Sequence, residues 1–286
     1  MDHSPTQAGG RLTPAVLAGF AAQLRREERA AGTIENYLRA ARQFSAFLAG
    51  APPTLEAALG WKSALLAARR APATVNAKLA ALNRLYGFLG LGGRVSFVRV
   101  QRRIFRPVQR QLSQQEYGRL LTAARAKKDA RLGLLMETIC SAGIRVSELR
   151  FITAEAARLG RAEIHLKGKV RVILLPAKLC RKLLRYAGQQ KVCSGPLFLA
   201  QGGAPMGRRL IWRQMKALCS AARVAPSKVF PHNLRHLFAT SFYTACRDLV
   251  RLADVLGHSS LETTRLYLAS SGEEHLRLLE GLRLVC

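Results

Sequence analysis

The sequence predicts a mainly α-helical protein with a small antiparallel β-sheet, divided into a helical N-terminal domain and a larger C-terminal domain. Residues 12–91 place apolar side chains at intervals of three and four, which is the pattern of amphipathic helices. Two short runs, 162–166 and 170–175, alternate or are apolar throughout, and Lys167–Lys169 between them is typical of a hairpin turn. An arginine-rich stretch near residue 100 separates the two regions.

The composition favours a folded protein that binds a polyanion. Of 286 residues, 49% are hydrophobic, which is enough for one large or two modest cores. Lys and Arg outnumber Asp and Glu by 46 to 17, so the formal charge is +29 and nucleic acid is the expected partner. An anionic membrane surface is disfavoured because the basic residues are spread along the whole chain. Residues 1–10 contain no export signal, which predicts a cytosolic protein.

The six cysteines do not form a ligand pattern. They contain no C-x-x-C pair, and no His stands at zinc-finger spacing. We predict mostly buried, reduced thiols, with no disulfide, no structural metal and no cofactor. A metal-dependent nuclease is disfavoured because no carboxylate cluster with ligand spacing appears.

The N-terminal domain is predicted over residues 11–95, after a flexible tail of residues 1–10. Thr13 and a first-turn proline begin a helix that stops near Gly32, and Thr33 begins the next helix.

Prolines set the remaining boundaries of this domain. Pro52–Thr54 interrupts the chain and restarts it as a third helix. Thr74, after Pro72, is predicted to cap a fourth helix that ends at Gly90–Gly93.

Residues 96–112 are predicted to form a basic linker that follows a phosphate backbone. A solvated surface loop is the plain alternative, but many arginines with hardly an acid among them favour contact with DNA. The candidate DNA-binding residues are Arg99, Arg102, Arg103, Arg106 and Arg110.

The second domain is predicted over residues 113–286. Ser113–Glu116 fits a capping box that opens its first helix, and a further helix leads to a turn at Gly143. The hairpin follows, and from residue 177 onward the pattern is again helical. Gly257 closes one helix, and Ser259–Glu262 offers a capping box that opens another.

Several residues of this domain suit attack on a phosphodiester. Tyr267 carries a hydroxyl that could act as nucleophile. Because the ordinary pKa of this group is about 10, a neighbouring residue must take or share its proton at neutral pH. Two arginines can clamp the nonbridging oxygens and stabilise added negative charge, and we assign Arg145 and Arg235 to this. Histidines can move protons near neutral pH, which suits His232 and His258. The leaving sugar oxygen needs a proton donor, and a hairpin lysine can supply one.

The plain interpretation of each such residue is packing or solvation. A lone Tyr or His is more often structural than catalytic, and His236 is interpreted as a packing or supporting residue. Glu148 is interpreted as a partner that orients a basic residue or the hairpin and not as a general base. The spacing between His258 and Tyr267 favours a catalytic role for this pair.

The motifs Gly143–Leu149, Pro231–His236, Leu256–Ser259 and Tyr267 resemble, in order and spacing, the catalytic domain of the tyrosine recombinase (phage-integrase-like) family. The two-domain layout is similar to that of its Xer-type members, and the N-terminal helices resemble the family's SAM-like core-binding domain. The resemblance implies a general-acid lysine in the hairpin, for which we favour Lys167, with Lys169 as the alternative.

The resemblance further implies a bacterial, nucleoid-associated site-specific recombinase. Tyr267 would form a 3′-phosphotyrosyl link and release a 5′-hydroxyl without ATP or metal. A homotetramer would exchange strands between paired sites in double-stranded DNA through a Holliday junction, with a C-terminal helix at about 273–286 docking on a neighbouring protomer. The resemblance is also compatible with an accessory protein or a partner recombinase. Chromosome-dimer resolution, mobile-element integration or excision, and inversion all fit the motifs.

Two other function classes share some of these features. A type IB topoisomerase uses the same chemistry on single duplexes, and the Xer-like N-terminal pattern argues against it. A noncatalytic DNA-binding protein with this fold is distinguished by Tyr267→Phe, which would leave its activity intact.

Overall fold

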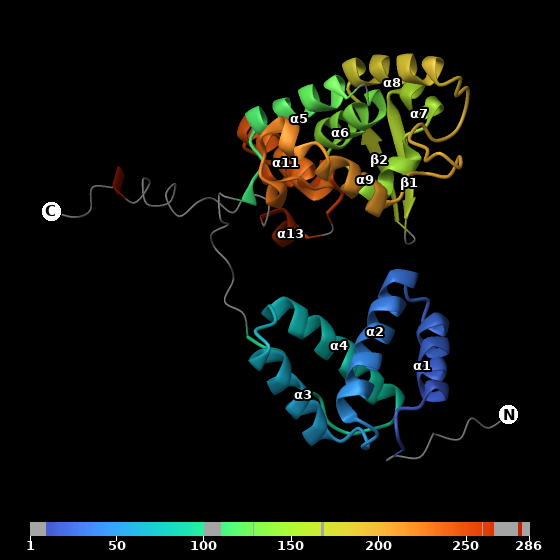
Figure 1. Ribbon diagram of the computed structural model, residues 1–286, viewed down its shortest axis with the longest axis vertical. Helices are drawn as coiled ribbons and strands as arrows, with labels where there is room; N and C mark the ends of the chain where they lie inside the picture. The colour runs from blue at the N-terminus through green and yellow to red at the C-terminus, as the bar shows by residue number, and fades with distance from the viewer. Residues whose placement is uncertain are drawn as a thin grey trace. The chain divides into compact units, whose positions relative to one another are not determined.

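The described residues of the computed structural model form two compact units, Met1–Arg102 and Arg103–Cys286, called here the N-terminal and C-terminal units (Figure 1). The structure describes residues 10–99, 110–127, 129–166, 169–258, 260–265 and 280–281. Within these ranges, helices are the main element and the β structure is a two-stranded sheet, so the predicted fold class is confirmed. None of the described helices combines the length and the apolar character needed to cross a bilayer.

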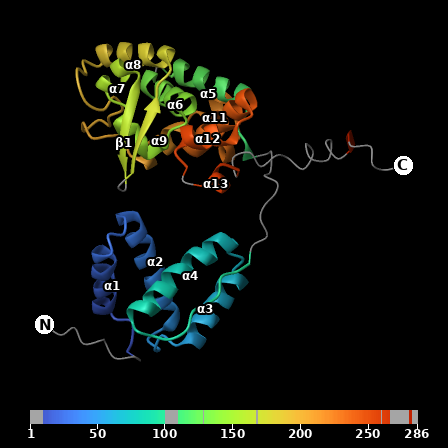
Figure 2. The ribbon, with the colours of Figure 1, turned by 180° about the vertical axis from the view of Figure 1, so that it is seen from behind.

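Helices alone build the described part of the N-terminal unit. They are α1 (Pro14–Arg26), α2 (Ala31–Leu48), α3 (Leu55–Ala67) and α4 (Pro72–Phe88). Figure 2 shows the same helices from behind. Aromatic side chains from different helices meet in the core. The centroid of the Phe44 ring lies 5.2 Å from that of Trp61 and 6.2 Å from that of Tyr86. Thr13 caps α1 as predicted and Thr54 caps α3, each accepting a hydrogen bond from the backbone N–H three residues on.

Three predicted helix boundaries in this unit are wrong. α1 ends at Arg26 and not near Gly32, because Glu28 adopts a left-handed conformation that turns the chain. α2 therefore begins at Ala31, and Thr33 lies inside its first turn.

The predicted start of α4 is the third wrong boundary. Pro72 is the first residue of this helix, and its fixed φ and missing N–H suit that position. Thr74, predicted as the cap, therefore lies within the first turn.

The chain that follows α4 is hydrogen-bonded along this helix. The Asn83 side chain donates to the carbonyl of Val95 and accepts from its N–H, at 3.0 and 2.9 Å. Asn76 makes the same pair of hydrogen bonds with Val98, at 2.9 and 2.8 Å. Residues 95–98 are thus held by side-chain amides of α4 where no sheet partner is present.

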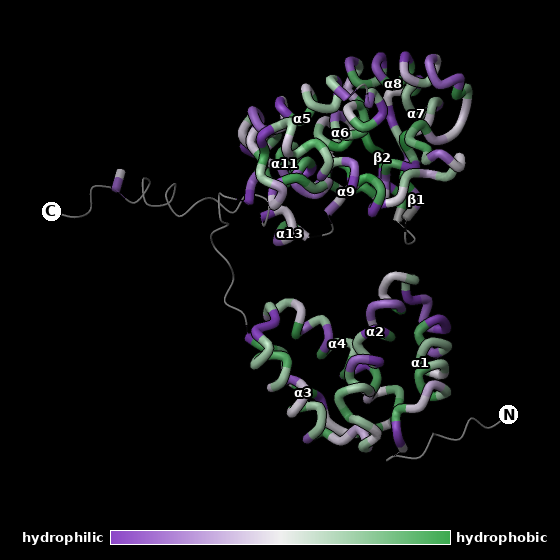
Figure 3. The backbone as a smooth tube through the Cα atoms, viewed as in Figure 1, coloured by the Kyte–Doolittle hydropathy of each residue, from purple (hydrophilic) through white to green (hydrophobic). Residues whose placement is uncertain are grey.

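The C-terminal unit packs helices around α6, next to the hairpin. Its elements are α5 (Gln114–Ala126), α6 (Ala130–Ala142), the 3₁₀ helix η2 (Val146–Phe151), α7 (Ala154–Leu159), β1 (Arg161–Leu166), β2 (Lys169–Leu174), α8 (Ala177–Gln189), α9 (Arg208–Lys216), α10 (Cys219–Ala222), the 3₁₀ helix η3 (Pro226–Lys228), α11 (Pro231–Cys246), α12 (Leu249–Leu256) and α13 (Leu261–Arg265). Leu135, Met136 and Ile139 of α6 are fully buried. Figure 3 shows hydrophobic stretches along α6 and β2.

The sequence signals for α5 and the hairpin are confirmed. Ser113 and Glu116 form both hydrogen bonds of a capping box. β1 and β2 pair antiparallel, with Ile164 opposite Arg171. Val170 and Val172 are exposed while Ile164 and Ile173 are buried, so one face of the hairpin covers the core.

The cysteines differ from the prediction of mostly buried thiols. Of the five that the structure describes, Cys180 and Cys219 are buried, Cys140 and Cys246 are half-buried and Cys193 is exposed. All five are free thiols.

Candidate active site

A glycine turn at the end of α6 places Arg145 at the start of η2. Gly143 has φ +62°, and a Cβ there would lie 2.4 Å from Cδ1 of Phe238, so only glycine fits. The chain then enters η2, where the backbone N–H of Arg145 donates to Oε2 of Glu148 at 2.7 Å. The position of Arg145 is therefore fixed through its own backbone.

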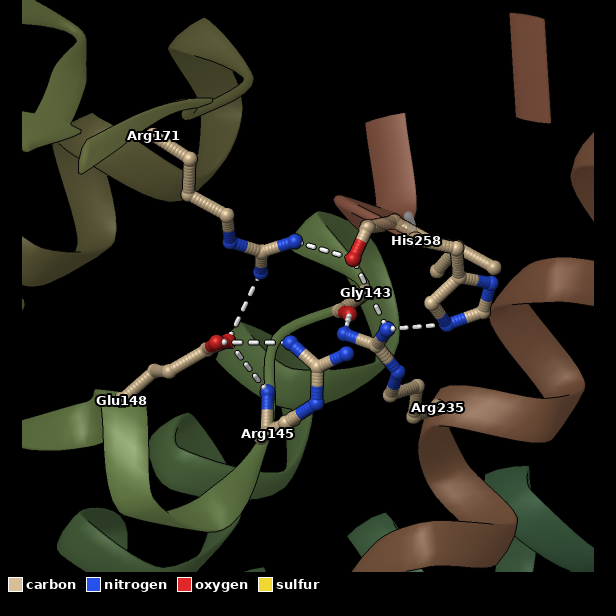
Figure 4. Close-up of polar contacts among 7 residues, drawn as sticks. Gly143, Arg145, Glu148, Arg171, Arg235 and His258 are labelled. Carbon is tan, nitrogen blue, oxygen red and sulfur yellow. Dashed lines mark hydrogen bonds and ion pairs between the residues drawn. The ribbon is translucent and has the colours of Figure 1, made fainter. Parts of the chain in front are cut away.

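Glu148 is a buried acceptor for donors from two elements. Its side chain is 3% exposed. Oε1 accepts from Nη1 of Arg145 at 3.0 Å, and Oε2 accepts from Nη2 of Arg171 on β2 at 2.7 Å (Figure 4). Glu148 thus orients both a basic residue and the hairpin, which confirms the interpretation of this residue from the sequence.

Arg235 is held in the interior by backbone carbonyls. It comes from α11 and is only 1% exposed. Nη1 donates to the carbonyl of Gly143, and Nη2 donates to the carbonyl of Leu256 at 2.9 Å. Nη2 also lies 2.9 Å from Nε2 of His258, as Figure 4 shows. The ends of α6 and α12 therefore both contribute to the position of Arg235.

The contacts of His258 indicate a neutral ring. Because Arg235 is always a donor, Nε2 must accept, and Nδ1 then carries the hydrogen and donates to Oγ1 of Thr264 at 2.8 Å. Burial, with the positive charges of Arg235, Arg145 and Arg171, lowers the pKa of His258 to about 4. At neutral pH this imidazole is an acceptor toward Arg235, and it ties α11 to α13.

Arg145, His232 and Arg235 line one open cavity of about 430 Å³. His232 is exposed in the first turn of α11, directly after Pro231. The other lining residues come mainly from η2 and α9 and are Ile144, Val146, Ser147, Arg208, Trp212, Phe230 and Pro231. Several cationic groups around an open cavity suit an anion such as a phosphodiester.

The structure brings four of the predicted catalytic residues together: Arg145, His232 and Arg235 around the cavity, and His258 through its contact with Arg235. Lys167 and Tyr267 lie outside the described residues. The alternative lysine, Lys169, opens β2.

The predicted DNA-contacting segments are described only in part. Arg99 and Arg110 are exposed, whereas Arg102, Arg103 and Arg106 lie outside the described residues. The predicted docking helix at 273–286 lies outside them too, apart from residues 280–281, and so does Ser259 of the predicted capping box.

Sequence reasoning missed three side chains near these groups. Arg171 contacts Glu148 and the carbonyl of Leu256, and Arg208 and Trp212 line the cavity. The sequence does mark Arg171. It stands two residues before Ile173 in an otherwise apolar strand, so it points to the same face of the hairpin as Ile173, the face toward the core. In the described parts of the chain, no group of three or more His, Cys, Asp or Glu is placed to hold a metal ion.

The family model for the phage integrase family matches residues 110–274, which is more than half of the 286-residue chain. The chain belongs to the phage integrase family. The prediction of a tyrosine site-specific recombinase, an enzyme that breaks and rejoins DNA, is confirmed. Among relatives of this family member, the tyrosine recombinase XerC of Methylobacterium nodulans is 30% identical over 279 residues, covering 87% of this chain and 86% of the relative.

Solved structures share the fold of this phage integrase family member at low sequence identity. The XerH site-specific recombinase bound to its difH substrate gives a TM-score of 0.67 at 19% identity, covering 97% of this chain and 90% of that one. A lambda integrase tetramer bound to a Holliday junction gives 0.72 at 15% identity, covering 88% and 76%. These likenesses extend over both units of the chain.

Proposed function

We propose that Tyr267 is the nucleophile of this recombinase and that Arg145, Arg235, His232 and His258 form its phosphate site. The observation that carries the proposal is the convergence of Arg145, His232 and Arg235, from two distant segments, on one cavity. Buried carbonyls and a buried carboxylate hold the two guanidiniums in place before any substrate arrives, which is the preorganisation that stabilises developing charge.

The proposed step is a transesterification, in which the energy of the cleaved phosphodiester bond is conserved in the new phosphotyrosyl bond. The Tyr267 oxygen attacks phosphorus, forming a tyrosyl O–P bond at the 3′ side while the P–O5′ bond breaks. The tyrosyl proton passes to a histidine of the site, His232 or His258, and a hairpin lysine, Lys167 or Lys169, gives a proton to the leaving 5′ oxygen. The reverse reaction with the 5′-hydroxyl of a partner strand completes the exchange.

Arg235 and His258 have separable parts in this step. Arg235 offers a rigid fork to the nonbridging oxygens, because carbonyls at both of its sides restrict its movement. His258 supports that fork as a neutral acceptor. His232 is exposed and lines the cavity, which supports a role for it as a donor to a phosphate oxygen.

The assembly on DNA is part of the same proposal. Residues 11–95 form the core-binding domain, residues 96–112 contact the phosphate backbone through Arg99, Arg102, Arg103, Arg106 and Arg110, and residues 113–286 form the catalytic domain. Four copies act on two double-stranded sites through a Holliday junction, and the helix at about 273–286 docks on a neighbouring copy. The net charge of +29 supports DNA binding, and a related integrase is known as a tetramer on a Holliday junction.

Covalent trapping tests this function. Purified protein is incubated in EDTA with nicked suicide duplexes taken from the DNA that flanks its gene, and adducts are separated on a denaturing gel and mapped by mass. We expect a protein–DNA adduct at Tyr267 that disappears in Tyr267→Phe. Tyr243→Phe is the matched control, because Tyr243 lies on α11 and is assigned no role in the reaction. Tight DNA binding without any adduct would favour the noncatalytic alternative.

The same substrates decide between the two lysines. Lys167→Ala should abolish cleavage if the favoured assignment is right, while Lys169→Ala should retain it. Loss only in Lys169→Ala would transfer the role to Lys169.

A further inference from the structure

Arg171 occupies the inner face of the hairpin, where the strand pattern would place an apolar side chain. Its neighbours Val170 and Val172 are exposed, whereas the Arg171 side chain is 17% exposed and its partner across the sheet, Ile164, is buried. A cation in such a position costs free energy unless it is paired and hydrogen-bonded. Its partners therefore indicate what the residue does.

The two ends of the Arg171 guanidinium bind two different parts of the site. Nη2 donates to Oε2 of Glu148 at 2.7 Å, and Nη1 donates to the carbonyl of Leu256. Glu148 also holds Arg145, and the Leu256 carbonyl also accepts from Arg235. One side chain thus joins the hairpin to the groups that hold both candidate phosphate-binding arginines (Figure 4).

The backbone next to Leu256 leaves space for this contact. A Cβ at position 257 would lie 2.3 Å from Nη1 of Arg171 and 2.6 Å from its Cδ. Gly257 also has φ +62°, which glycine adopts without strain. The guanidinium of Arg171 therefore occupies, at the end of α12, space that a side chain at residue 257 would need.

Neutralisation of Glu148 does not account for this arrangement. Arg145 already gives the carboxylate two hydrogen bonds, one from its backbone and one from its guanidinium. The contact between Arg171 and the Leu256 carbonyl adds no charge to Glu148, and its effect is to tie β2 to the end of α12.

We propose that Arg171 is a positioning residue that fixes the hairpin, and with it the lysine that protonates the leaving oxygen, against the phosphate-binding arginines. The inference rests on the proposed function. Lys169 begins β2 two residues before Arg171, so a displacement of β2 at Arg171 moves this lysine, and Lys167 stands only two residues earlier in the sequence. A misplacement of about 1 Å at a catalytic group can lower a rate about 100-fold.

A change of leaving group separates positioning of the lysine from every other role. Arg171→Lys and Arg171→Gln are compared with the unchanged protein on two forms of the nicked duplex that traps the adduct. One form carries the natural 5′ oxygen at the scissile bond and the other carries a bridging 5′ sulfur. A thiol with a pKa near ~8.5 leaves as the thiolate without a proton donor, whereas an alkoxide needs one. Lysine keeps the charge of Arg171 but lacks the fork that reaches both acceptors.

We expect cleavage of the oxygen substrate to fall about 10- to 100-fold in both variants, and cleavage of the sulfur substrate to stay within about threefold of the unchanged protein. Arg161→Gln is the matched control, since Arg161 is an exposed arginine at the other end of the same hairpin, opposite Leu174. It should leave both rates unchanged.

Two results would overturn the inference. Equal losses on both substrates would mean that Arg171 acts on the phosphate site or the nucleophile, and undiminished cleavage of the oxygen substrate by Arg171→Lys would mean that only its charge matters. Thermal unfolding of each variant checks the fold, and Arg171→Lys carries the test if Arg171→Gln does not fold. Failure of the unchanged protein to form an adduct on either substrate would instead refute the proposed function, on which the inference depends.

Discussion

Arg145 and Arg235 line the same cavity but are held in different ways. Arg235 is 1% exposed and donates to two backbone carbonyls and a neutral imidazole, whereas the Arg145 side chain is 43% exposed and is paired with a carboxylate. Neutral acceptors fix a guanidinium without cancelling its charge, while a carboxylate both fixes and partly neutralises it. Arg235 is therefore a rigid part of the interior, whereas Arg145 is anchored through Glu148 and leaves much of its side chain open to a ligand.

The largest expected effect is that of Arg235→Ala. Loss of this fork removes a preorganised donor, which should slow adduct formation about 1,000-fold. The buried carbonyl of Gly143 also loses its donor, which costs about 1–3 kcal/mol of unfolding free energy. Single-turnover cleavage and urea unfolding measure the two effects. Unchanged stability of this variant would contradict the difference between the two arginines, because Arg235 would then not be a rigid part of the interior.

Arg145→Ala should separate catalysis from stability. We expect adduct formation to slow about 100-fold or more, since a phosphate-binding cation is lost. The unfolding free energy should change by less than about 1 kcal/mol, because the Arg145 side chain is partly exposed and Glu148 keeps its contact with Arg171. The same two measurements apply, and a large loss of stability would contradict the difference between the two arginines.

A smaller effect is expected from the pH dependence of stability. The pKa of His258 is lowered to about 4 in the folded protein, whereas an unfolded histidine has a pKa near ~6.5. Between these values the unfolded chain binds more protons, so the contribution of His258 is complete above the unfolded value and is lost as pH falls toward 4. Arg235, Arg145 and Arg171 disfavour the imidazolium, and Glu148 favours it.

The matched variant for this prediction is His258→Gln, which keeps an acceptor for Arg235 without a titrating ring. Melting temperatures of both proteins are measured from pH 7 to pH 4.5. The unchanged protein should lose more stability than the variant over this range. Parallel curves would show that His258 is not held neutral by its surroundings.

Local signals predicted most elements correctly. The capping box at Ser113, the cap at Thr13 and the alternation of the hairpin each depend on residues close in sequence, and the structure contains all of them. The predicted end of α1 is wrong because the helix ends where Glu28 adopts a left-handed conformation, which the residue type does not predict.

The candidate site shows the same limit. The residue types at Arg145, His232, Arg235 and His258 were visible in the sequence, and the fold brings them together. The strand pattern marks Arg171 as a cation facing the core, but it does not predict the role of this residue, which depends on two contacts with residues 23 and 85 positions away in the chain. One of those contacts is to a backbone oxygen, which every residue type has.

The use of backbone oxygens as acceptors has an evolutionary consequence for Arg235. The acceptors at residues 143 and 256 are peptide oxygens, so no single substitution can delete them. Leu256 can be exchanged for another buried apolar residue while its carbonyl stays in place, whereas Gly143 is constrained for a separate reason, the proximity of Phe238. Sequence drift around Arg235 can therefore be extensive while the geometry of its guanidinium is inherited through the main chain.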